Sequence, residues 1–227
     1  GITIYSNIRR FIYYLLAGNF TEVGVIVIAI SFNLNLPLTA LMILFINIVT
    51  STIPAMALSI EPTHDKVMSQ KPRNPKENLL SNYMLSKIFV LIPFMIFGTL
   101  GIFLWELNVM NSSMEKAMTM AFVTLILFEL FHTFNARRLH TKIFDKDFFS
   151  NKYIFVGFLL SLFITLMMIY TDFGNLIFNT VPLNISDWIA IIFVSSTVII
   201  FTEIIKLSVK AEFIEQKNLQ GSLIKLE

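Results

Sequence analysis

The chain has 227 residues, of which 56% are hydrophobic and only 14% are charged. This balance excludes an ordinary soluble domain, in which about a quarter of the residues are charged, and it is typical of membrane proteins. The net charge of +2 gives no nucleic-acid signature, and the absence of cysteine excludes disulfides, thiolate metal sites and a cysteine nucleophile. We therefore expect an all-α, polytopic membrane protein.

Six apolar stretches each have about the 20 residues that cross a bilayer as a helix. We expect spans at residues 11–34, 38–60, 88–107, 117–135, 153–170 and 188–207. Together they predict a six-helix transmembrane bundle that forms one domain over residues 1–227. No signal peptide is expected, because no basic segment with a small-residue cleavage site precedes the first span. Since Gly1 is not an initiator Met, we expect the numbering to start inside a longer protein.

The basic residues fall on one side of the predicted bundle. Six spans place both chain ends on the same side, and every Lys and Arg except Lys116 belongs to a tail, to a loop on that side, or to the end of the last span there. The positive-inside rule makes this side cytoplasmic, so both termini are predicted to be cytoplasmic. Glu203 lies one turn from Lys206 near the cytoplasmic end of the last span, where either snorkelling or a pair with Lys206 is expected.

The second predicted span contains a polar interruption. Asn47, Thr50 and Ser51 stand at i, i+3 and i+4 on one helix face, and Pro54 frees a backbone carbonyl near Thr50. In hydrocarbon such a helix persists only where other groups satisfy the freed backbone. A cluster of oxygen ligands at membrane depth suits a hard cation. The interruption therefore predicts half of an ion site.

The first span supplies the other half. An ionisable group near the bilayer centre costs on the order of 2.5 kcal/mol or more, so Glu22 should face protein, and Asn19 shares its helix face. Glu129, in the fourth span, is a candidate from a third helix for the same cavity. The alternative is that these polar groups only join helices by hydrogen bonds, with Glu129 a protonated carboxyl inside the bundle. His132 is expected to be a hydrogen-bonded residue near the helix end.

Short motifs follow one another in a fixed order along the first half of the chain. They are IYSNIRRFI at 4–12, GNFTEV at 18–23, NIVT at 47–50, PAMAL at 54–58 and KPRNPKE at 71–77, with FELF at 128–131 and FNAR at 134–137 in the fourth span. This set resembles the C-terminal membrane region of P-type cation-transporting ATPases, closest to the calcium-pump branch. The last two spans match that family only in hydropathy.

The resemblance implies that the chain is the last six of ten transmembrane helices of a pump. The residues at the positions of the family's cation ligands are Asn19, Glu22, Asn47, Thr50, Ser51 and Glu129. Ser51 departs from the family pattern, because calcium-type pumps usually have Asp-Gly where this chain has Ser51-Thr52. The loss of one carboxylate favours a monovalent cation or a one-ion stoichiometry.

The resemblance also implies what this chain lacks. ATP and Mg²⁺ are used by domains N-terminal to this region in the family, so no ATP hydrolysis is expected of the chain alone. We expect the transport domain of an ATP-driven, calcium-pump-like cation pump, with the loop at 61–87 in contact with the phosphorylation domain and residues 1–10 acting as a lever. The rival hypothesis is a six-span secondary transporter or a non-catalytic membrane scaffold.

Overall fold

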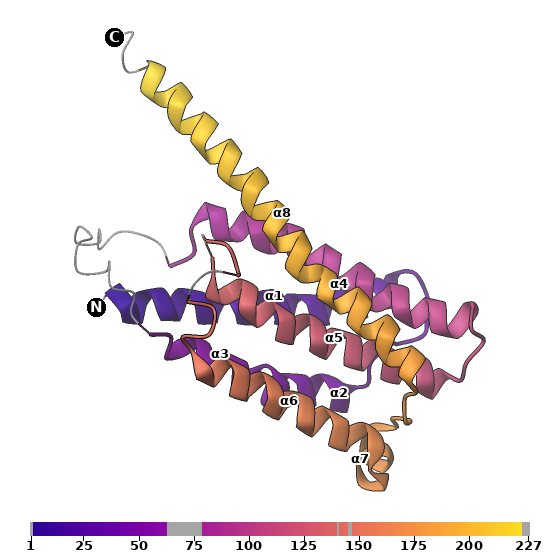
Figure 1. Cartoon of the computed structure of the whole chain (residues 1–227). Coiled ribbons are helices and arrows are strands. Elements are labelled where there is room, and N and C mark those ends of the chain that lie inside the picture. Colours follow the sequence, from indigo (N-terminus) through magenta and orange to yellow (C-terminus); the bar gives the residue numbers. More distant parts are fainter. Residues whose placement is uncertain (1, 63–78, 140, 145–146, 224–227) are drawn as a thin grey trace.

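The computed structural model describes residues 2–62, 79–139, 141–144 and 147–223, with side chains from residue 3 to residue 208 within these ranges. All regular structure in these ranges is helical (Figure 1). The elements are α1 (Ile2–Ser31), α2 (Ala40–Phe45), the π-helical turn η1 (Ile46–Thr50), α3 (Thr52–Ser59), α4 (Asn82–Asn108), α5 (Met114–Arg137), α6 (Lys152–Tyr170), α7 (Asp172–Phe178) and α8 (Ile185–Leu223).

Six helical units in the described ranges are long and apolar enough to cross a membrane. They are α1, the run from α2 through α3, α4, α5, α6 and the first part of α8. This finding confirms the predicted all-α, six-helix membrane bundle, and the protein is an integral multi-pass membrane protein. Helix α1 begins well before residue 11, and α4 begins before residue 88 because the Ser81 hydroxyl caps it by accepting from the backbone N–H of Met84. The short helix α7 lies in a segment that the sequence predicted as a loop.

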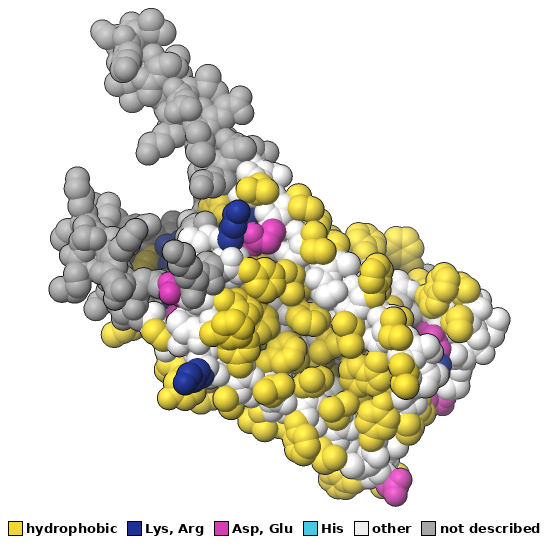
Figure 2. Space-filling view, viewed as in Figure 1, with side chains coloured by type: hydrophobic (Ala, Val, Ile, Leu, Met, Phe, Trp, Pro, Cys, Tyr) yellow, Lys and Arg dark blue, Asp and Glu magenta, His cyan; other side chains and the backbone are white. Residues whose placement is uncertain are grey.

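The surface between the two ends of the bundle is apolar. Figure 2 shows hydrophobic side chains over most of the visible face, while charged side chains gather toward its ends. Phe89, Phe163 and Phe193 are each more than half exposed. Such a surface would aggregate in water but matches lipid tails. The phenylalanines therefore act mainly as lipid-facing and packing residues.

Helix α5 is the central element of the bundle. Nearly all of its residues are buried, and it packs against α1, α3, α4 and α8. At Gly98 of α4 an added Cβ would lie only 2.5 Å from Cζ of Phe128. The missing side chain thus allows α4 to approach α5 closely. Any polar group on α5 must consequently find its partner inside the protein.

Ion pairs lie at the two ends of the bundle. Lys116, at the start of α5, pairs with Glu106 of α4 at 2.8 Å and with Asp187 of α8 at 3.1 Å. The one basic residue predicted on the non-cytoplasmic side is therefore neutralised by two acids. At the other end Glu203 and Lys206 form a pair at 2.6 Å, which is one of the two arrangements expected there. Most of the predicted docking loop lies outside the described residues, which omit 63–78.

Candidate cation site

The polar interruption of the second span is a π-helical turn. The N–H of Ser51 bonds to the carbonyl of Ile46 at 2.8 Å, one residue further back than in an α-helix, so the carbonyl of Asn47 loses its usual donor. The Thr52 hydroxyl donates to that carbonyl at 2.8 Å. The Thr50 hydroxyl donates to Ile46 at 3.1 Å. Hydroxyl groups thus satisfy the carbonyls of Ile46 and Asn47, which precede the carbonyl near Thr50 that Pro54 was predicted to free.

Glu22 and Asn47 join the first two spans. Glu22 is 2% exposed on α1, and its Oε2 accepts a hydrogen bond from Nδ2 of Asn47. The same nitrogen donates to the carbonyl of Ile43 at 3.0 Å, so the Asn47 amide is held by its own helix as well. Oε1 of Glu22 is buried without a hydrogen-bond partner. One carboxylate oxygen is therefore free to bind something else.

Glu129 adds a third helix to the same cluster. It is 1% exposed on α5, its Oε2 accepts a hydrogen bond from the Ser51 hydroxyl, and its Oε1 is buried without a hydrogen-bond partner. The carboxyl groups of Glu22 and Glu129 are close enough to interact directly. The structure therefore brings together two carboxyl groups, one amide and one hydroxyl from α1, the second span and α5.

Gly18 makes room for the Glu129 carboxyl. A Cβ added at Gly18 would lie 2.8 Å from Oε1 of Glu129, closer than side-chain carbons normally approach. Tyr14, one turn before Gly18 on α1, is 1% exposed, and its hydroxyl lies near Ser51 and Glu129. Sequence reasoning missed both residues, and their only signal was a position on the same face of the first span as Glu22.

No basic side chain in the described ranges balances the charge of this cluster. None of the described Lys or Arg residues forms an ion pair with Glu22 or Glu129. Within the described ranges no third acid or histidine joins them to make a cluster of three. A buried carboxylate without a partner is stable only when a proton or a cation neutralises it. The arrangement can thus bind a cation through carboxylate, amide and hydroxyl oxygens.

Two of the predicted ligands lie apart from this cluster. Asn19 is exposed on α1, and Thr50 is buried with its hydroxyl bonded to its own helix. His132 differs from the expected helix-end residue. It is fully buried, it lies between the rings of Tyr13 and Tyr14, and neither ring nitrogen has a hydrogen-bond partner in the described structure. The prediction of a hydrogen-bonded residue was wrong, because the aromatic rings of Tyr13 and Tyr14 on α1 pack against the imidazole.

Comparison with known proteins relates the chain to ion pumps. The family model described as "Cation transporting ATPase, C-terminus" matches residues 35–208. A calcium-transporting ATPase of Bacillus subtilis is 37% identical over 197 residues, which cover 86% of this chain and 22% of that protein. Calcium-transporting ATPase type 2C member 1 of Mus musculus is 32% identical over 218 residues, covering 96% of this chain and 24% of that protein. The chain spans about a quarter of the length of these relatives.

The close approach of Gly18 to Glu129 gives a test in which no candidate ligand residue is itself substituted. Gly18→Ala should displace the Glu129 carboxyl, and an overpacking cost of about 1–3 kcal/mol borne by the bound state corresponds to a loss of cation affinity of roughly 5- to 150-fold. Calcium titration of the full-length protein measures it. Gly101→Ala is the matched control, because a Cβ there meets nothing within 4 Å. Equal affinities in the two variants would show that Glu129 does not contact the ion.

Proposed function

The chain belongs to the family of C-terminal regions of cation-transporting ATPases, and on that premise we propose that it is the transport portion of an ATP-driven calcium pump. The observation that carries the proposal is the buried pair Glu22 and Glu129, two carboxyl groups that interact with one another and form no ion pair with the described Lys and Arg residues. Residues 1–227 act together as one membrane domain, and the transported cation crosses between α1, the second span and α5.

The donor set favours calcium over softer metals. Carboxylate, amide and hydroxyl oxygens are hard ligands of the kind that calcium prefers. Two carboxylates carry a charge that one dication balances, which supports one ion at this site. Asn47 contributes its amide oxygen, since its nitrogen is already bonded to Glu22 and Ile43. Ser51 contributes a hydroxyl where calcium pumps usually have a carboxylate. Asn19 and Thr50 complete the set of ligands only if α1 and η1 rotate so that these side chains face the bound cation.

The energy for transport comes from outside this chain. ATP and Mg²⁺ bind to domains of the full-length pump that precede it, and phosphorylation there changes the tilt of α1. Helix α1 is continuous from Ile2 through Glu22, so a movement at its start reaches the carboxyl pair. The loop at 61–87 contacts the phosphorylation domain, and both termini are cytoplasmic. The excess of basic residues at that end of the bundle supports this orientation.

Replacing a charged ligand tests the proposal directly. Glu22→Gln should abolish calcium-dependent phosphorylation of the full-length pump by ATP, because an amide cannot supply the lost charge. The loss of apparent calcium affinity should exceed the roughly 10- to 100-fold loss of metal affinity that follows removal of an outer-shell partner. Glu115→Gln, the same change in the first turn of α5 and outside the carboxyl pair, is the control. Unchanged calcium dependence in Glu22→Gln would contradict the proposed role.

Ser51 allows a test in the opposite direction. Ser51→Asp replaces the hydroxyl that donates to Glu129 with a third carboxylate, so the empty site should become less stable through repulsion while the calcium-bound site gains a charged ligand. Calcium should therefore raise the melting temperature of this variant more than that of the wild type. Ser51→Asn, which matches the size of Asp without its charge, is the control. Identical calcium-induced shifts in all three proteins would place Ser51 away from the ion.

A further inference from the structure

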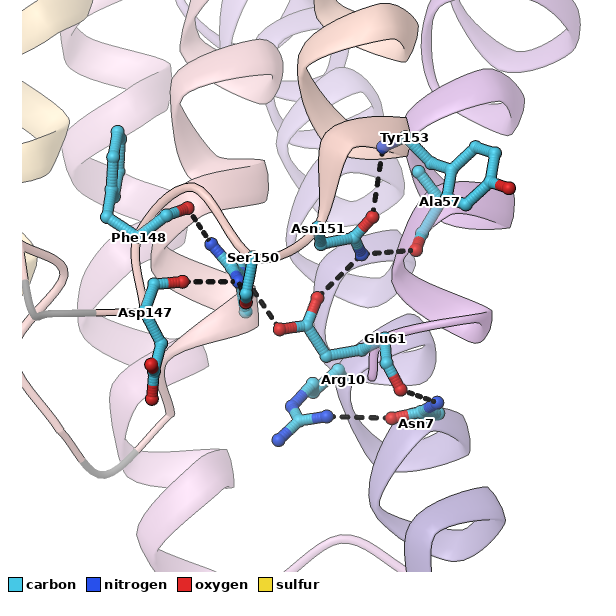
Figure 3. A network of polar contacts seen from close by, with 10 residues as sticks. Asn7, Arg10, Ala57, Glu61, Asp147, Phe148, Ser150, Asn151 and Tyr153 are labelled. Atoms are coloured by element: carbon cyan, nitrogen blue, oxygen red, sulfur yellow. Dashed lines mark hydrogen bonds and ion pairs between the residues drawn. The ribbon is translucent and has the colours of Figure 1, made fainter. Parts of the chain in front are cut away.

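A second buried polar cluster lies at the end of the bundle where α3 and α5 stop. We call Asn7, Glu61, Arg137 and Asn151 the end cluster (Figure 3). Glu61 and Arg137 are 2% and 1% exposed, and Nε of Arg137 donates to Oε1 of Glu61 at 2.6 Å. Nδ2 of Asn151 donates to Oε2 of Glu61 at 2.6 Å. Both oxygens of this carboxylate are therefore occupied, unlike those of Glu22 and Glu129.

Arg137 fixes the turn between α5 and α6. Its Nη1 donates to the carbonyl of Phe148, and its Nη2 donates to the carbonyl of Asp147 at 2.8 Å and to the hydroxyl of Ser150. Every nitrogen of the guanidinium group thus donates a hydrogen bond, either to Glu61, just after α3, or to residues 147–150 before α6. A planar group with donors in fixed directions sets an orientation as well as a distance.

The end cluster also binds carbonyls in the last turn of α3 and just after it, where the helix supplies no further donors. Nδ2 of Asn7, on α1, donates to the carbonyls of Ser59 at 3.1 Å and of Glu61 at 3.0 Å. Nδ2 of Asn151 donates to the carbonyl of Ala57 at 3.1 Å. Figure 3 shows the Asn7 and Asn151 side chains directed at this segment from two different helices. The C-terminal end of α3 is therefore attached to α1 and to the start of α6.

The helices joined here are those that carry the carboxyl pair. Asn7 and Glu22 lie on α1, Ser51 directly precedes α3, and Glu129 and Arg137 lie on α5. The two residues on α5 are about two turns apart, or roughly 12 Å along the helix. Helices are stiff over such lengths. The relative positions of α1, α3 and α5 at the end cluster therefore fix the distance and orientation between the Glu22 and Glu129 carboxyl groups.

Stability alone gives little reason for this ion pair. Removing two charges from solvent costs about as much as their attraction returns, so apolar side chains of similar volume often stabilise a protein equally well. What apolar side chains cannot reproduce is the directed set of hydrogen bonds that joins α1, α3, α5 and α6. The cluster is thus better suited to fixing geometry than to adding stability.

We propose that Glu61 is a positioning residue for calcium, and that the end cluster fixes the relative placement of α1, α3 and α5 on which the geometry of the carboxyl pair depends. This inference rests on the proposed transport function. It assigns Glu61 and Arg137 no contact with the ion. Their effect is transmitted along two helices. Ser51 directly precedes α3, which ends near Glu61, and Glu129 lies on α5 with Arg137.

A double apolar variant separates positioning from stability. In the full-length protein Glu61→Leu with Arg137→Met removes both charges of the pair together. The melting temperature of this variant should fall, because the carbonyls of Asp147 and Phe148 lose their donor. Its calcium affinity, corrected for the folded fraction, should fall about tenfold, as when an outer-shell partner of a metal site is lost. The ratio of calcium to manganese affinity should also change, because the two ions differ in size.

Two further variants complete the experiment. Glu203→Leu with Lys206→Met removes the ion pair at the same end that lies wholly on α8, and it should leave calcium affinity unchanged. Asn7→Leu removes the bonds from α1 to the carbonyls of Ser59 and Glu61, together with the bond that Arg10 donates to Asn7. It should also weaken calcium binding, so it decides the question if the double variant does not fold. Wild-type affinity and selectivity in folded Asn7→Leu or in the folded double variant would overturn the inference while leaving the proposed function standing. A wild-type protein that binds no calcium would overturn both.

Discussion

The inability of lipid to solvate charge is the constraint on which this structure depends. Within the bilayer each buried polar group needs a partner from the protein, and three of the five buried acids in the described residues form an ion pair. Glu106 and Asp187 pair with Lys116, and Glu61 pairs with Arg137. Glu22 and Glu129 differ, because each keeps one buried oxygen without a donor. This exception identifies the place where the protein holds charge for a purpose other than stability.

Local backbone features allow the exception. The π-helical turn displaces the hydrogen bonding of the second span by one residue, and threonine hydroxyls satisfy the carbonyls around it. Asn47 and Ser51 can then donate to two different carboxyl groups on two different helices. Gly18 leaves space that any side chain would fill. A site of four side chains thus depends on residues that contribute no ligand.

The sequence predicted the fold and much of the candidate site because both leave local signals. Apolar length indicated the spans, and the cost of a mid-membrane carboxylate indicated that Glu22 and Glu129 face protein. The Glu61–Arg137 pair could not be predicted, because it joins a residue in an apparent loop to a helix end 76 positions away. The exposure of Asn19 is likewise decided by how α1 turns against its neighbours, which helical spacing alone does not fix. The same rotation of α1 places Tyr13 and Tyr14 against the His132 ring, which the sequence did not predict.

In the proposed function, Glu22 and Glu129 together hold the transported cation. A structure of the full-length protein with calcium bound tests this most directly. We expect one calcium ion with an oxygen of Glu22 and an oxygen of Glu129 each at about 2.3–2.6 Å, and with the hydroxyl of Ser51 turned from Glu129 toward the ion. A calcium ion bound elsewhere, with both carboxyl groups still hydrogen-bonded only to Asn47 and Ser51, would contradict it.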